Sequence, residues 1–130
     1  MRRISILPVL LIGLGGFLGA NVRYWLGLWA AQRWGTTFPY GTLLINVTGS
    51  LILGFFLTLA TQRLLIHPNW RLLIATGFLG AYTTFSTFTY ESVALLQNGA
   101  WQAGLVNILA SVLFGLAGVL FGSTLARLIA

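Results

Sequence analysis

Four apolar blocks separated by short polar segments divide the chain. We expect these blocks to cover residues 4–31, 40–61, 72–96 and 101–125. Each is long enough to cross a bilayer as an α-helix, which takes about 20 largely apolar residues. The separators contain Gly, Pro and Asn, which are typical of turns, and they are too short to form a domain outside the membrane. The pattern predicts one all-α domain, residues 1–130, with four transmembrane helices.

The first block begins like a secretory signal peptide. Arg2 and Arg3 precede an apolar run that reaches Ala20, and such a run with small residues at its end is typical of a cleaved leader. Apolar character resumes at Tyr24, however, and continues to Ala31. We therefore expect the segment to be retained as the first transmembrane helix.

Composition supports a membrane protein. The chain of 130 residues is 58% apolar and only 6% charged, whereas soluble domains are about 25% charged. Its seven basic residues are scattered arginines, so the net charge of +6 does not indicate a nucleic-acid partner. There is no cysteine, which excludes disulfides and thiolate metal sites. The single acid, Glu91, lies near the edge of the third block.

The arginines also predict an orientation. Four crossings place both termini on one side, and arginine favours the cytoplasmic side of a membrane. Termini in the cytoplasm are therefore expected from the count of arginines. The terminal side holds Arg2, Arg3, Arg63, Arg71 and Arg127, and the other side holds Arg33 and Arg23.

The third block carries an unusual cluster of hydroxyls. Lipid offers hydroxyls no partner, so such a cluster should face protein, water or an ion. Glycine beside β-branched threonines also weakens a helix, and broken transmembrane helices are where transporters hold ions. We expect a break here near the membrane midplane, at the main functional site. The cluster consists of Thr83, Thr84, Ser86, Thr87 and Thr89, which follow Gly80.

Polar residues in the first two blocks each have two interpretations. Arg23 lies beyond the centre of the first block, where it either snorkels outward or lines a water-filled vestibule that attracts anions. Asn46 shares a small, polar helix face with Gly49 and Ser50. Its amide either bonds a neighbouring helix or donates an N–H to an anion.

Aromatic and polar positions in the last two blocks have similar alternatives. Phe85 and Phe88 are three residues apart and share a helix face. They either pack conventionally or present their electropositive ring edges to an anion path. Asn107, Ser111 and Gly115 form a narrow stripe at four-residue steps. The stripe is either part of a polar path or a place where the hydroxyl bonds its own helix backbone.

Three motifs together resemble the Fluc (CrcB) family of fluoride channels, in order and over nearly the whole chain. The most specific is Gly77–Phe88, with the sequence GFLGAYTTFSTF. The weaker ones are Gly16–Ala20 followed by Arg23-Tyr24, and Gly41-Thr42-Leu43 followed by Asn46 and Gly49.

The resemblance implies a passive, fluoride-specific channel that exports fluoride and relieves its toxicity, not an enzyme. It implies a multi-pass protein of the bacterial inner membrane, assembled as an antiparallel, dual-topology homodimer with two pores. A structural sodium ion that is not transported would lie at the dimer centre. The implied sodium ligands are the carbonyls of Gly80 and Thr83, and the fluoride pathway would include Phe85, Phe88, Asn46, Thr84, Ser86, Thr87, Asn107 and Ser111, with Arg23 in the vestibule.

Two features fit this resemblance poorly, and one other function competes with it. The arginine bias favours a single orientation, whereas an antiparallel dimer needs both. Tyr82 carries a hydroxyl that requires a buried partner. A small proton-coupled multidrug exporter would have a similar size, but it needs a membrane-embedded carboxylate, and we expect Glu91 to lie too near a helix end. A non-conducting structural subunit would leave the motifs unexplained.

Overall fold

The computed structural model describes residues 3–62 and 66–129, and this part of the chain contains helices and short connections without any strand. Arg2 and Arg63, which contribute to the expected orientation, lie outside the described residues. The elements in chain order are α1 (Ile6–Trp34), α2 (Tyr40–Gln62), α3 (Pro68–Trp70), η1 (Arg71–Leu79), α4 (Gly80–Tyr82), α5 (Phe85–Gln97) and α6 (Trp101–Ile129).

A glycine with positive φ follows two of the helices, α1 and α5. After α1, Gly35 has φ 81° and its N–H bonds the carbonyl of Ala31. After α5, Gly99 has φ 82° and its N–H bonds the carbonyl of Leu96 at 3.1 Å. Side chains disfavour this left-handed backbone region, which glycine enters without strain. The chain therefore reverses direction sharply at both points.

The third apolar block forms a composite segment rather than one helix. Its first part runs through α3, the π-helical η1 and α4, where the Gly80 N–H bonds the carbonyls of Ala75 and Gly77. Thr83 and Thr84 then adopt extended backbone conformations, with φ/ψ of −83°/154° and −148°/112°. The helix is thus interrupted inside the hydroxyl cluster, where the sequence predicts a break. The whole segment runs from Pro68 to Gln97, slightly beyond the expected 72–96.

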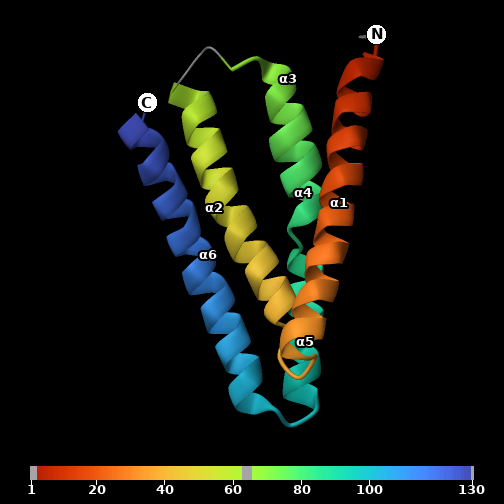
Figure 1. Ribbon diagram of the computed structural model, residues 1–130, viewed down its shortest axis with the longest axis vertical. Helices are drawn as coiled ribbons and strands as arrows, with labels where there is room; N and C mark the ends of the chain where they lie inside the picture. The colour runs from red at the N-terminus through yellow and green to blue at the C-terminus, as the bar shows by residue number, and fades with distance from the viewer. Residues whose placement is uncertain (1–2, 63–65, 130) are drawn as a thin grey trace.

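Three helices within the described residues are long and apolar enough to cross a membrane, judged by length and composition. They are α1, α2 and α6. The composite third segment differs, because each of its helical pieces is shorter than a span requires. Its two parts lie end to end beside the long helices (Figure 1).

Close backbone contacts hold the helices in two main pairs, α1 with η1 and α2 with α6. A Cβ atom added to Gly19 of α1 would collide with the carbonyl of Phe78, and one added to Gly122 of α6 would collide with the carbonyl of Leu51. Small residues permit this approach, which stabilises membrane helices through van der Waals contact. In Figure 1, α2 and α6 run side by side, and α1 follows the first part of the composite segment.

The buried core is small and central. Ile45, Leu79 and Tyr82 form its buried cluster, and Phe78 packs against it. Many large apolar side chains of α1 and α6 are exposed instead, Leu128 at 76% among them. A soluble monomer rarely exposes so much continuous apolar surface. The outer faces therefore suit lipid or another membrane-embedded chain, as expected of a multi-pass membrane protein.

Candidate functional site

The amide of Asn46 on α2 holds the break in the composite segment. Its Nδ2 donates to the Thr84 carbonyl at 3.0 Å, and its Oδ1 accepts from the Thr84 N–H at 2.8 Å. In a continuous α-helix that N–H would donate to the carbonyl of Gly80. Asn46 therefore takes away the helical donor of the Gly80 carbonyl. This contact corresponds to the interpretation in which the Asn46 amide bonds a neighbouring helix. Its Nδ2 has a second hydrogen, which can still donate to another acceptor.

Thr83 fits closely against α2 at the break. A Cβ atom on Gly49 would collide with the Thr83 Cγ2, so only glycine leaves room there. The N–H and hydroxyl of Thr83 both donate to the Leu79 carbonyl, at 3.1 and 2.9 Å. Thr83 thus closes the first helical part while its own carbonyl lies in extended backbone.

The break offers backbone carbonyl oxygens rather than a cluster of metal-binding side chains. Among the described residues no three His, Cys, Asp or Glu side chains gather as metal ligands. The break instead provides two carbonyl oxygens. That of Thr83 lies in extended backbone, and that of Gly80 lacks the Thr84 N–H, which bonds Asn46 instead. Oxygen ligands suit hard cations such as sodium. Gly80 itself is exposed on the surface of the chain.

A cavity of about 270 Å³ adjoins the break; we call it the smaller cavity. It brings together side chains from α2, α5 and α6 that are far apart in the sequence. Six of the residues predicted from sequence line it, namely Asn46, Thr83, Thr84, Phe85, Phe88 and Ser111. The fold therefore brings most of the candidate pathway residues together around one cavity.

The two phenylalanines of this cavity have different surroundings. Their ring centroids are 5.8 Å apart, with an angle of 55° between the rings. Phe88 is 8% exposed, whereas Phe85 is 77% exposed. Phe88 is therefore packed within the chain, whereas Phe85 lies largely on its surface.

Two residues of the polar stripe on α6, Asn107 and Ser111, have different surroundings. Ser111 lines the cavity, and its hydroxyl is buried with no hydrogen-bond partner among the described residues. It therefore does not bond its own helix backbone. Asn107 instead donates to Ser92 Oγ at 2.9 Å, and Ser92 donates to the Phe88 carbonyl at 2.8 Å. Asn107 supports the backbone of α5 near Phe88.

A larger cavity of about 600 Å³ lies between α1, the start of α2, and α5. Arg23, Thr84 and Thr87 are among its lining residues. The Thr84 hydroxyl donates to Thr87 Oγ1 at 3.0 Å and accepts from the Thr87 N–H at 3.2 Å. Ser86 is exposed nearby, with its Oγ 3.4 Å from Thr84 Oγ1. Thr84 lines both cavities and is the residue common to them.

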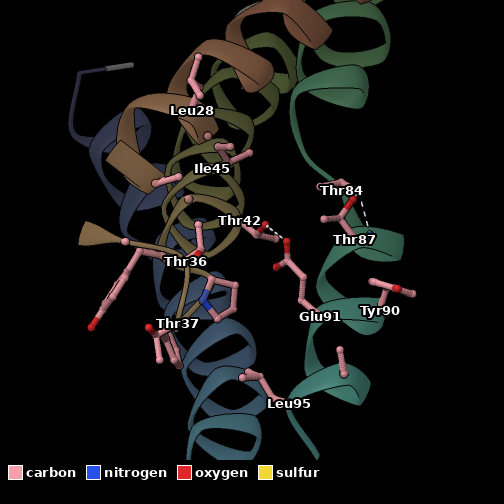
Figure 2. A pocket seen from close by; sticks show the side chains of 18 of the residues that line it. Leu28, Thr36, Thr37, Thr42, Ile45, Thr84, Thr87, Tyr90, Glu91 and Leu95 are labelled. Carbon is pink, nitrogen blue, oxygen red and sulfur yellow. Dashed lines mark hydrogen bonds between the residues drawn. The ribbon is translucent and has the colours of Figure 1, made fainter. Parts of the chain in front are cut away.

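Two residues of the larger cavity have no role in the sequence-based site. The Thr42 hydroxyl donates to Glu91 Oε1 at 2.9 Å, and Figure 2 shows this pair facing each other across the cavity. The other carboxylate oxygen of Glu91 and the Nε of Arg23 are buried without a partner among the described residues. Glu91 thus lies inside a cavity rather than at a helix edge. Its status as the only acid in the chain is the signal that sequence reasoning undervalued.

Comparison with known proteins places these features in a family. Residues 10–123 match the family model described as CrcB-like protein, Camphor Resistance (CrcB). A protein of Roseiflexus sp. (strain RS-1) is 49% identical over 121 residues, which cover 93% of this chain and 98% of the relative. One from Koribacter versatilis (strain Ellin345) is 50% identical over 123 residues, 95% and 98% of the two chains.

A more divergent relative comes from Clostridium perfringens (strain 13 / Type A). It is 43% identical over 125 residues, which cover 96% of this chain and 98% of the relative. All three relatives are named fluoride-specific ion channel FluC, which is the name of a channel and not of an enzyme. The similarity spans both cavities and the break between them. The chain belongs to the CrcB family.

Proposed function

We propose that this chain is the subunit of a fluoride-specific channel that lets fluoride leave the cell passively and so relieves fluoride toxicity. The observation that carries the proposal is the similarity, over more than nine-tenths of the chain, to proteins named fluoride-specific ion channels. The arrangement of the two cavities supports it. They share Thr84, which lies between a larger cavity that contains Arg23 and a smaller one lined by hydroxyls and aromatic rings.

The chemistry of the cavities suits fluoride. A small, strongly hydrated anion needs hydrogen-bond donors that replace its water, and these must not hold it so tightly that it cannot leave. The buried Ser111 hydroxyl and the remaining Nδ2 hydrogen of Asn46 offer neutral donors in the smaller cavity. Arg23 lines the larger cavity, where its charge attracts anions at the entrance. The electropositive edges of Phe85 and Phe88 add to the path.

We also propose a structural sodium ion at the break, in a dimer of two antiparallel subunits. The carbonyls of Gly80 and Thr83 would hold it, because Asn46 withdraws one helical donor and Thr83 has extended backbone. The ion would supply positive charge that fixes the two breaks against each other; it would not be transported. A two-fold axis through the exposed Gly80 face would bring both breaks to one ion. The expected location is the bacterial inner membrane.

One observation favours a second function. Glu91 is partly buried in the larger cavity beside Thr42, and a proton-coupled exporter uses such a carboxylate to exchange a proton for its substrate. In that case transport would require a proton gradient, and the substrates would be cationic drugs. A passive channel requires no gradient.

Fluoride efflux from proteoliposomes separates these functions. Purified protein is reconstituted into vesicles loaded with potassium fluoride, and a fluoride electrode records efflux after valinomycin sets the potential. We expect rapid fluoride efflux without a proton gradient. Vesicles loaded with chloride should retain their chloride. Equal chloride release would contradict a fluoride-specific pore. Fluoride release that depends on a proton gradient would exclude a passive channel.

A further inference from the structure

The hydroxyl of Tyr82 makes a directed bond to α2. Tyr82 is the last helical residue before the break and is only 4% exposed. Its hydroxyl lies 2.8 Å from Thr48 Oγ1. Thr48 has one hydroxyl hydrogen, which is directed to the carbonyls of Leu44 at 2.7 Å and Ile45 at 3.2 Å. Tyr82 is therefore the donor, and Thr48 is the acceptor.

This bond means that α2 fixes both sides of the break. Thr48 bonds Tyr82, the residue immediately before the break, and Asn46 bonds Thr84, the last residue of the break. The intervening residue, Thr83, packs against Gly49. With one hydrogen bond at Tyr82 and two at Thr84, the peptide groups between these residues have little freedom to rotate relative to α2.

The ring of Tyr82 is fixed as well as its hydroxyl. It stacks on Phe78, with ring centroids 5.9 Å apart and an angle of 23° between the planes. Its edge also lies over Gly49, where a Cβ atom would come within 3.2 Å of the Tyr82 Cδ1. A phenylalanine at this position could keep both contacts. Only the bond to Thr48 requires tyrosine.

We propose that the Tyr82–Thr48 bond positions the carbonyls of Gly80 and Thr83 and thereby sets the affinity of the break for sodium. The inference rests on the sodium site in the proposed function. Tyr82 is a positioning residue, because its hydroxyl is directed to α2. Carbonyl ligands bind a cation best when they are held in place before the ion arrives, and supporting hydrogen bonds provide that order.

Two substitutions remove the bond with little change of shape. Tyr82→Phe deletes the donor and keeps the stacked ring. Thr48→Val deletes the acceptor and keeps a β-branched side chain. The matched control is Thr61→Val, because Thr61 lies on the same helix and bonds the carbonyl four residues earlier at 2.7 Å, but is exposed. Each variant is purified in detergent as the full chain.

Equilibrium binding of radioactive sodium, displaced by unlabelled sodium, measures the affinity without reference to transport. We expect Tyr82→Phe and Thr48→Val each to raise the sodium Kd by about three- to tenfold, which corresponds to one lost neutral hydrogen bond. The double variant should show no further increase, because both changes remove the same bond. Thr61→Val should bind as the parent chain does.

Thermal unfolding in sodium-free buffer separates positioning from general stability. If the two variants unfold at lower temperature but keep the parent sodium Kd, the bond serves only stability and the inference is wrong. An additive effect in the double variant would also overturn it. Parent protein that conducts fluoride but binds no sodium would remove the sodium site, and with it this inference, while the channel function stands. If Tyr82→Phe does not fold, the Kd of Thr48→Val decides the outcome.

Discussion

At the residue scale, the two phenylalanines of the smaller cavity are the sharpest test of the pathway. We expect Phe85→Ile and Phe88→Ile each to slow fluoride efflux from proteoliposomes at least tenfold, because isoleucine has no electropositive ring edge. Phe114→Ile is a matched control, since Phe114 is exposed on α6 and lies outside the lining of both cavities. Fluoride efflux at the parent rate in both variants would indicate that the two rings only pack against their neighbours and do not line the pathway.

The amide of Asn46 allows a second prediction at this scale. Asn46→Asp removes the Nδ2 donor and directs a carboxylate oxygen toward the Thr84 carbonyl. It also adds a negative charge beside an anion path, so fluoride efflux should fall by more than tenfold. Asn69→Asp, in the short helix α3, makes the same chemical change away from both cavities and should conduct normally. Efflux at the parent rate from Asn46→Asp would show that neither bond nor charge at this position matters.

At the element scale, the α2–α6 pair depends on glycine at its closest approach. Gly122→Ala would place a Cβ atom against the Leu51 carbonyl, and overpacking of this kind costs about 1–3 kcal/mol. We expect a lower thermal unfolding temperature in detergent. Gly13→Ala is the matched control, because nothing lies within 4 Å of its Cβ position. Equal unfolding temperatures for the two variants would contradict the close packing of α2 on α6.

At the scale of the whole molecule, the orientation of the chain in the membrane is the prediction most easily refuted. The arginine count favours one orientation, yet the proposed sodium site needs two opposed subunits, and the positive-inside preference is statistical. A single cysteine at exposed Gln97, in a chain that has no other, can be labelled from outside sealed vesicles. We expect about half of the protein to react before permeabilisation and the rest afterwards. Reaction confined to one side would refute the antiparallel dimer.

Several parts of the structure could be predicted from sequence because they follow from local chemistry. Apolar length predicts the long helices, since an α-helix satisfies its own backbone in lipid. Glycine with threonines predicts the break, which occurs at Thr83 and Thr84. The family motif in residues 77–88 contains four of the residues that line the smaller cavity, namely Thr83, Thr84, Phe85 and Phe88. None of these predictions requires knowledge of which helices are neighbours.

Tertiary structure alone decided which polar groups meet. Glu91 looks like a helix-edge acid until Thr42, 49 residues away in sequence, is placed beside it. Asn46 and Tyr82 likewise find their partners across the α2 interface rather than on their own helices. Helix periodicity gives the face of each side chain but not the partner opposite it, because rotation and sliding of packed helices depend on contacts between distant segments. The sequence determined the helices and the break, and packing assembled the cavities around Thr84.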